Sequence, residues 1–128
     1  LGQVISKFFI EPIHEQYKLV GEIGYFLIFY SNILANPDIL LGNENPEWRA
    51  KVIGASEKFR ELSSLLLSRS NAIKHYSFFA GLKVVIKFEA IKDVSGRLIR
   101  ISNNLGPRAK GSENVDDKKE IMRLLKLG

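Results

Sequence analysis

Hydrophobic residues recur every three or four positions along most of the chain, which is the spacing of amphipathic α-helices. The longest such stretch covers residues 12–36. Pro12 suits the first turn of a helix, where a missing N–H costs nothing, and Pro37 stands directly after the last turn. We therefore expect one continuous helix here, and we expect the other elements to pack against it. Its predicted core face comprises Ile13, Tyr17, Val20, Ile23, Leu27, Tyr30 and Leu34.

Three further segments carry the same helical spacing, namely residues 46–73, 86–105 and 114–127. Asn45 and Pro46 supply a cap and a first-turn proline for the first of these segments. Asn114, followed three residues later by Asp117, resembles a cap for the last segment. Each of the three is therefore predicted to be a separate helix.

Residues 82–89 are ambiguous by pattern. The sequence KVVIKFE within them is rich in β-branched residues, as strands are, yet no second segment could pair with it, and a lone strand leaves its backbone groups unsatisfied. We therefore expect a short helix over 75–80, a turn, and a helix that begins between Val84 and Phe88. The chain is then all-α: one domain over residues 1–128, built as an antiparallel bundle of four to five helices with short loops.

The composition fits this fold class. The chain has 128 residues, of which 45% are hydrophobic and 26% are charged, as in an ordinary globular domain. It contains no cysteine, which excludes disulfides, thiolate metal sites and cysteine nucleophiles. Its charge is uneven, because residues 1–64 carry six basic and eight acidic side chains whereas residues 65–128 carry thirteen and six. The basic second half is either a solvated surface or a contact for an anionic partner.

A second pattern lies on the side of the first helix that faces away from its predicted core face. Four residues follow the spacing of one helix face there, and they are Lys18, Glu22, Tyr25 and Phe29. A charged stripe thus continues into two aromatic rings, which makes it a candidate partner surface. The alternative is that another segment of the same chain covers the rings. We expect intramolecular cover by the N-terminal segment, with a symmetric dimer as the second explanation.

Basic residues of the second half suggest another candidate surface, for an anion or nucleic acid. This surface comprises Lys92, Arg97, Arg100, Arg108 and Lys110. Glu89 and Asp93 interleave with these charges, and no aromatic ring lies among them to stack on nucleic-acid bases. A basic bundle that binds nucleic acid is therefore the alternative function and not the leading one.

The sequence contains no recognisable catalytic or metal-binding constellation. His14-Glu15 begins like the zinc-protease signature, but Lys18 stands where a second histidine is required. Glu11 and His14 match half of the ligand set of a di-iron bundle, and the second half is missing. His75 is followed by two phenylalanines where histidine phosphotransfer domains carry a lysine and a glycine. We therefore expect a chain without enzymatic activity, bound metal or cofactor.

The N-terminal quarter of the chain contains a group of residues with a familiar arrangement. They are Pro12, Glu15, Gln16, Gly21, Glu22, Ile23, Leu27, Tyr30, Asn32 and Pro37, with a second group in the sequence LIRISN at 98–103. This segment resembles the start of the cytosolic part of small, uncharacterised prokaryotic proteins that have an N-terminal membrane helix and a helical domain. The resemblance implies a topology and no activity. Residues 1–11 would then be a juxtamembrane segment, and their apolar sequence would be the tail of a membrane or signal segment.

The leading functional hypothesis combines these observations. The chain is expected to be a non-enzymatic helical-bundle interaction domain, the soluble cytosolic part of a membrane-tethered protein. It would act through a protein partner or through self-association as a homodimer. The alternative is the basic bundle that binds nucleic acid.

Overall fold

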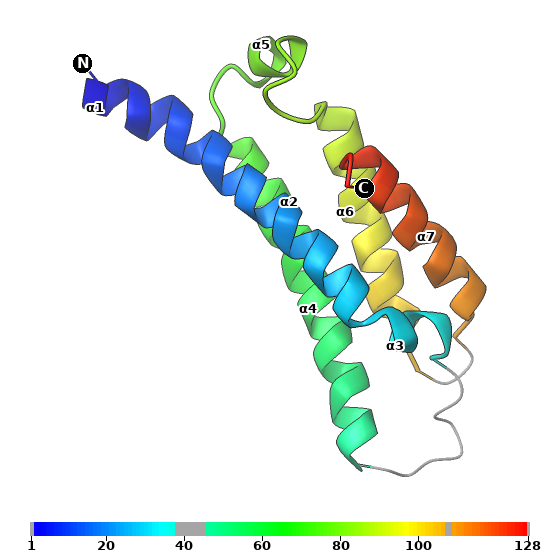
Figure 1. Ribbon diagram of the computed structural model, residues 1–128. Helices are drawn as coiled ribbons and strands as arrows, with labels where there is room; N and C mark the ends of the chain where they lie inside the picture. Colours follow the sequence, from blue (N-terminus) through cyan, green and yellow to red (C-terminus); the bar gives the residue numbers. More distant parts are fainter. Residues whose placement is uncertain (1, 38–45, 107–108, 128) are drawn as a thin grey trace.

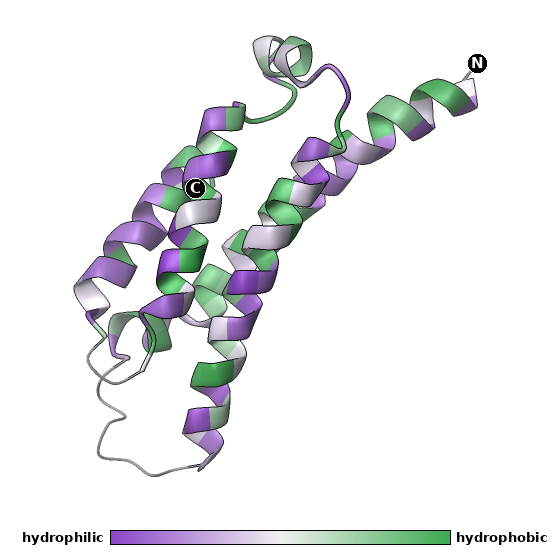
Figure 2. Ribbon diagram, turned by 180° about the vertical axis from the view of Figure 1, so that it is seen from behind, coloured by the Kyte–Doolittle hydropathy of each residue, from purple (hydrophilic) through white to green (hydrophobic). Residues whose placement is uncertain are grey.

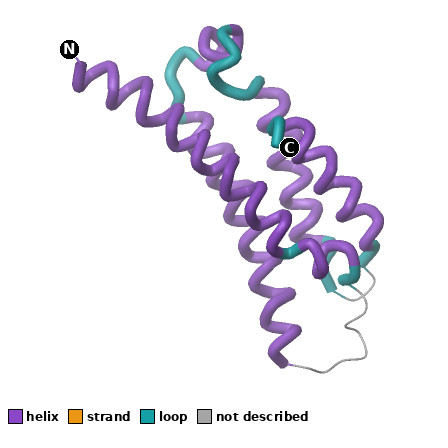
Figure 3. Tube along the Cα trace, in the orientation of Figure 1, coloured by secondary structure: helices purple, strands orange, loops and turns teal. Residues whose placement is uncertain are grey.

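The computed structural model describes residues 2–37, 46–106 and 109–127. All regular secondary structure in these three ranges is helical, and no strand occurs in them (Figure 3). The prediction of an all-α chain is therefore confirmed. Within the ambiguous stretch 82–89, residues 82–87 form a loop. Helix α6 (Phe88–Asn103) begins directly after this loop. The sequence pattern also predicts that Ile39, Leu40 and Leu41 pack against the core, but these three residues lie outside the described residues.

The chain begins with one unbroken helical run made of α1 (Gly2–Ile5), η1 (Ser6–Ile10) and α2 (Glu11–Phe29) (Figure 1). The expectation that Pro12 starts a new helix is therefore wrong. A proline inside an α-helix lacks one N–H, and its ring clashes with the carbonyl one turn earlier. The η1 segment is a π-helix, a wider turn in which the N–H of Glu11 reaches back to the carbonyl of Ser6. We attribute the passage of the helix through the proline to this wider turn.

The first predicted helix is also interrupted near its end. α2 is separated from α3 (Ser31–Ala35) by Tyr30, and α3 continues in a new direction (Figure 1). The hydroxyl of Ser31 donates to the backbone carbonyl of Leu27 at 3.0 Å. Hydrogen bonds of this kind compete with the helix's own backbone ladder and favour a bend. The expected single helix over 12–36 is thus two helices.

The centre of the molecule is the pair α4 (Pro46–Asn71) and α6, and not α2 as expected. These two helices share the most extensive contact between any two elements, whereas α2 packs mainly on α4. Serines line their seam. The hydroxyl oxygens of Ser63 and Ser95 lie 2.6 Å apart, and Ser56 donates to the carbonyl of Ser102 at 2.7 Å. Small hydroxyl side chains let two helices approach closely while their own oxygens form hydrogen bonds across the contact.

Successive long helices alternate in direction. In Figure 1, α2 and α6 run downward, whereas α4 and α7 (Gly111–Leu124) run upward. α7 packs against α6 and α3. It begins three residues before the predicted cap Asn114, so that prediction is wrong. A Cβ atom at position 111 would lie 1.9 Å from the carbonyl oxygen of Ala35, and therefore only glycine allows α7 to start this close to α3.

A short helix, α5 (Tyr76–Gly81), confirms the one predicted near 75–80. It lies at the same end of the molecule as α1 (Figure 1). Two non-glycine residues beside it have left-handed backbone, His75 with φ 55° and Lys83 with φ 61°, which marks two sharp changes of chain direction. Figure 2 shows hydrophobic residues along the projecting N-terminal helix and on α5. Among the described helices, none is both long and apolar enough to cross a membrane.

On α4 and α6 the apolar residues at helical spacing are the buried ones, and on α2 the predicted face is buried at Ile23 and Leu27 but not at Tyr17. Tyr17, which was predicted to face the core, is 77% exposed, and its neighbour Gln16 is buried instead. The amide of Gln16 donates to the hydroxyls of Ser70 at 2.9 Å and Tyr76 at 2.8 Å. A polar amide can be buried when it is hydrogen-bonded in this way. The fully buried core residues include Ile23, Leu27, Phe59, Leu66, Ile91, Leu98 and Ile101.

Candidate functional site

The predicted partner surface on α2, here called the α2 stripe, consists of Lys18, Glu22, Tyr25 and Phe29, and all four residues are exposed. The Tyr25 ring stacks on the Phe29 ring with their centroids 5.7 Å apart. Lys18 forms an ion pair with Glu15 at 3.1 Å, and this hydrogen bond lowers the pKa of Glu15. The stripe is therefore a real surface feature with an aromatic end.

The expectation that the rings are covered within the chain is wrong. Tyr25 is 59% exposed and Phe29 is 63% exposed. The N-terminal segment extends in line with α2 instead of folding back over them, because η1 carries the helix through Pro12. Ile28, which lies beside both rings on α2 and which the sequence pattern did not single out, is 62% exposed as well.

Further rings connect the α2 stripe to the core. The ring of Phe26 lies 5.0 Å from that of Tyr25 and 6.1 Å from that of Tyr30. Tyr30 in turn packs 5.8 Å from the fully buried Phe59 of α4. Because aromatic pairs at these distances attract one another, the exposed rings are held in place by a chain of contacts that ends in the core.

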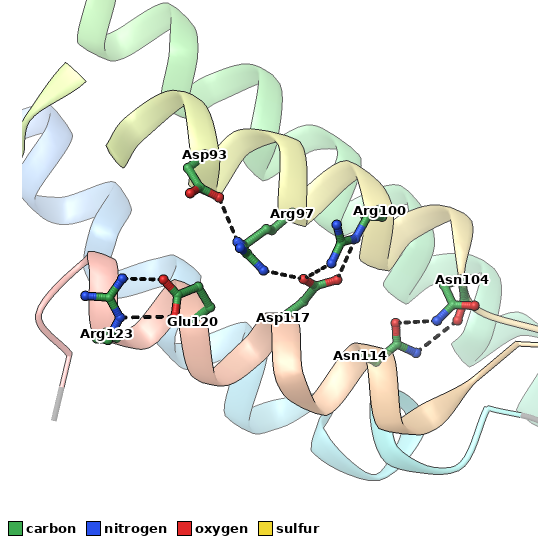
Figure 4. A network of polar contacts seen from close by, with 8 residues as sticks. All are labelled: Asp93, Arg97, Arg100, Asn104, Asn114, Asp117, Glu120 and Arg123. Atoms are coloured by element: carbon green, nitrogen blue, oxygen red, sulfur yellow. Dashed lines mark hydrogen bonds and ion pairs between the residues drawn. The ribbon is translucent and has the colours of Figure 1, made fainter. Parts of the chain in front are cut away.

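Of the five basic residues proposed as an anion surface, the four that the structure describes do not gather into a free cationic patch. Figure 4 shows Arg97 and Arg100 of α6 converging on Asp117 of α7, with Arg97 Nη1 2.8 Å from Asp117 Oδ1 and Arg100 Nε 3.0 Å from Asp117 Oδ2. Burial tends to lower the pKa of Arg97, but hydrogen bonds to Asp93 and Asp117 outweigh it and raise that pKa. Both arginines therefore pair with the buried carboxylate of Asp117, although the Arg100 side chain remains 66% exposed.

Lys92 and Lys110, two further members of that set, each make a separate local contact. The ammonium of Lys92 lies 5.6 Å from the centre of the Phe88 ring. The backbone N–H of Lys110 donates to the side chain of Asn104 at 3.1 Å. Arg108 lies outside the described residues. The geometry thus gives the nucleic-acid alternative no assembled surface among the residues that are described.

Sequence reasoning missed the polar cluster to which these arginines belong. Asn114 has no exposed surface; its amide donates to the carbonyls of Leu34 at 3.1 Å and Asn104 at 2.9 Å, and its own oxygen accepts from the Asn104 amide at 2.9 Å (Figure 4). Asp117 is buried as well. A signal was available, because Asn114 stands two helical turns before the buried Ile121 and therefore on the same face.

A second polar cluster ties α2, α4 and α5 together. Tyr76 of α5 accepts a hydrogen bond from Gln16 of α2 and donates one to the carbonyl of Ile86. Burial raises the pKa of the Tyr76 phenol, although its hydrogen bonds to Gln16 and Ser70 act in the opposite direction. All of these groups are engaged with each other, and so the cluster holds α5 in place.

Hydrophobic side chains gather where the N-terminal helix meets α5, a region here called the apolar end. Its exposed members are Val4, Ile5, Phe8, Ile10, Phe78, Leu82 and Val84. A groove of about 710 Å³ runs between the two segments, lined almost entirely by apolar side chains such as Ile13 and Phe79. Phe9 stacks on His75, with their ring centroids 6.1 Å apart.

Neither histidine takes part in a metal site in the described ranges. His14 is exposed and lines the groove, and His75 makes no side-chain cap hydrogen bond to α5. Within the ranges that the structure describes, no group of three or more potential metal-ligating residues comes together.

The chain matches no protein-family model, and comparisons with curated proteins and with solved structures found no match either. The surfaces and clusters described above are therefore the basis for assigning a function. Two of them expose apolar side chains to solvent: the α2 stripe with Ile28, and the apolar end.

Proposed function

We propose that this chain is a non-enzymatic interaction domain, an antiparallel bundle of four to five helices that binds a protein partner through the α2 stripe. The observation that carries the proposal is the exposure of two stacked aromatic rings, Tyr25 and Phe29, beside an exposed Ile28. Contiguous apolar patches of this kind on a soluble surface mark contacts with other molecules. Aromatic side chains are also the commonest anchors of protein interfaces.

The packing of these rings against neighbouring aromatic side chains supports a role in binding. Tyr25 and Phe29 stack on each other, and Phe26 and Tyr30 connect them to the core. Side chains that are already held in one orientation lose little conformational freedom when a partner arrives. Binding energy from burying these rings is therefore available for affinity.

A second copy of the chain is the partner that best fits the α2 stripe. One apolar patch can be self-complementary about a two-fold axis. The charged half of the stripe carries one positive and one negative residue, Lys18 and Glu22. A symmetric pair of stripes thus has no net charge, so the stripes themselves do not repel each other.

The same proposal places the bundle on the cytosolic side of a membrane, as the soluble part of a tethered protein. Two observations support this placement: the resemblance to small prokaryotic proteins with an N-terminal membrane helix, and the apolar α1 and η1 segments, which project from the packed helices (Figure 1). Fractionation of cells that express the full-length gene product tests the placement, and recovery in the soluble fraction would contradict it.

Sedimentation velocity over a range of protein concentrations tests the interaction itself. The wild-type chain should show a monomer–dimer equilibrium. Tyr25→Ser combined with Phe29→Ser should remain a monomer with an unchanged circular-dichroism spectrum and melting temperature, because both rings are largely exposed in the monomer. Ile53→Ser is the matched control, since Ile53 is 52% exposed on α4 and outside the stripe. A wild-type chain that stays monomeric, or a dimer that survives the double substitution, would overturn self-association through the stripe.

A further inference from the structure

The apolar end exposes more hydrophobic surface than the α2 stripe, and it belongs to a different part of the molecule. Phe8 is 44% exposed, Phe78 is 62% exposed and Leu82 is 58% exposed. In residues 2–10 apolar side chains occur at five of nine positions, and four of them, Val4, Ile5, Phe8 and Phe9, recur at the spacing of one helix face. An amphipathic helix whose apolar face remains in solvent is typical of a contact with a partner or a membrane interface.

Basic side chains predominate around this end, and the nearest acidic residues, Glu11 and Glu15, follow on the first turns of α2. Residues 1–10 and 62–88 contain five basic side chains and no acidic ones. The basic side chains are those of Lys7, Arg69, Lys74, Lys83 and Lys87, and all are exposed. One of them, Lys74, holds its ammonium 5.4 Å from the centre of the Phe8 ring. The apolar end is therefore a hydrophobic surface bordered by cations.

We infer that the apolar end binds the surface of an anionic lipid membrane. Segments that lie in a membrane interface combine apolar and aromatic side chains, which enter the boundary between headgroups and acyl chains, with lysines and arginines that meet anionic headgroups. Each basic residue near such a surface contributes favourably, and the contribution falls off within a Debye length. The apolar end combines exposed hydrophobic side chains and lysines in one surface, which is built from α1, η1, α5 and the loop over 82–87.

A second copy of the chain fits this surface poorly. A two-fold contact would bring five basic side chains against the same five of the partner, and juxtaposed like charges oppose association. The groove beside α5 lacks the converging polar groups that fix the orientation of a small-molecule ligand.

This inference goes beyond the proposed protein contact, because it concerns a different surface and a different class of partner. It shares α1 and η1 with the proposed membrane placement but does not depend on a tether, since it assigns lipid binding to the described chain itself. The α2 stripe can bind protein whether or not the apolar end binds lipid. The two surfaces also supply controls for each other, since each can be altered by replacing two exposed rings.

Co-sedimentation with lipid vesicles tests the inference on the whole chain. The wild-type protein should bind vesicles of phosphatidylcholine with phosphatidylserine and should bind phosphatidylcholine alone at least about tenfold more weakly. Binding to the anionic vesicles should weaken as salt is added, because the attraction between lysines and headgroups is screened. No binding to anionic vesicles at low salt would overturn the inference.

Two pairs of variants separate the apolar and the electrostatic contributions. Phe8→Ser with Phe78→Ser should weaken binding to anionic vesicles by about tenfold or more, whereas Tyr25→Ser with Phe29→Ser removes two rings elsewhere and should leave it unchanged. Lys74→Glu with Lys83→Glu should have a comparable effect. Its matched control, Lys51→Glu with Lys119→Glu, changes the net charge equally at exposed positions away from the apolar end. If, in either comparison, the variant and its matched control lose vesicle binding to the same extent, the inference is wrong.

A spectroscopic readout locates the contact. Because the chain has no cysteine, Phe78→Cys provides a unique site for an environment-sensitive dye, and Ile53→Cys provides the same label on α4, far from the apolar end. Anionic vesicles should shift the emission of the dye at position 78 to the blue and leave the dye at position 53 unchanged. If the dye at position 78 responds to protein concentration instead of vesicles, and sedimentation shows an oligomer that Phe8→Ser with Phe78→Ser abolishes, the apolar end is a protein interface and the lipid inference is wrong.

Discussion

Polar side chains are buried at the contact between α6 and α7, called here the α6–α7 seam, whereas hydrophobic side chains are exposed at the apolar end. At the seam, Asn114 and Asp117 are buried, and the side-chain oxygens of both accept hydrogen bonds from neighbouring helices or loops. At the apolar end, Phe8 and Phe78 stand in solvent. The chain can thus pack even an amide and a carboxylate into its interior. The exposed phenylalanines are therefore a property of that surface and do not reflect an inability of the fold to bury side chains.

Among the substitutions that test this contrast, Asn114→Ala should have the largest effect on stability. The substitution leaves the carbonyls of Leu34 and Asn104 without their partner and opens a cavity at a fully buried position. We expect the free energy of unfolding to fall by about 3 kcal/mol, measured by urea denaturation. Asn32→Ala, at an exposed position of α3, is the control and should change it by less than about 0.5 kcal/mol. Equal effects at the two positions would show that the seam contributes little to stability.

Tyr76→Phe should have a smaller effect that depends on pH. The variant loses the hydrogen bonds to Gln16 and Ile86, which should lower the free energy of unfolding by about 1 kcal/mol at neutral pH. Burial raises the pKa of Tyr76 in the folded state, so above pH about 10 the unfolded chain loses the phenol proton while the folded chain keeps it. The contribution of Tyr76 to stability is thus complete below that pH and declines as the pH rises through the folded pKa.

Urea denaturation of both proteins at about pH 8 and about pH 11 measures this effect. Wild type should lose more stability between the two values than the phenylalanine variant, since only the wild type carries this phenol. A difference between the proteins that stays constant with pH would contradict the assigned burial of Tyr76.

Phe78→Ser should have the smallest effect on stability. Because this ring is 62% exposed, we expect the free energy of unfolding to change by less than about 0.5 kcal/mol in thermal or urea denaturation. The result sharpens the contrast with the α6–α7 seam, because replacing the buried asparagine should lower stability strongly whereas replacing the exposed phenylalanine should hardly change it. A decrease of several kcal/mol would mean that the apolar end is packed in solution, and the contrast would fail.

The parts of the fold that were predictable depend on local spacing. On α4 and α6 the helical repeat of apolar residues coincides with the buried positions, from Phe59 and Leu66 to Ile91 and Leu98. A stripe of large apolar side chains is removed from water only when it packs against the core, so the pattern determines which face of the helix is buried. The helix boundaries agree within a few residues for the same reason.

The errors arose where a partner distant in the sequence decides the outcome. Gln16 is buried because Ser70 and Tyr76 bond its amide, and that pairing turns Tyr17 outward on α2. Asn114 could pass for a helix cap until Leu34 and Asn104 are known to surround it. Local spacing contains no information about such contacts.

The candidate sites divide in the same way. The spacing that joins Lys18 to Phe29 is local, but the exposure of that stripe depends on the course of the N-terminal segment, which the sequence pattern did not reveal. The anion surface assumed that Arg97 and Arg100 were free, but Asp117, from a helix seventeen or more residues later, engages both. The apolar end could not be derived from the sequence, because the continuation of the helix through Pro12 positions Phe8 near α5.

Gly111 has an evolutionary consequence. With the Ala35 oxygen only 1.9 Å from where a Cβ would stand, every other amino acid at this position requires α3 and α7 to move apart. A lineage that keeps this packing must therefore keep the glycine, together with the amide one turn later and the carboxylate after it. Gly111-x-x-Asn114-x-x-Asp117 is thus a short fingerprint by which divergent homologues of the chain can be recognised even where their apolar residues have interchanged freely.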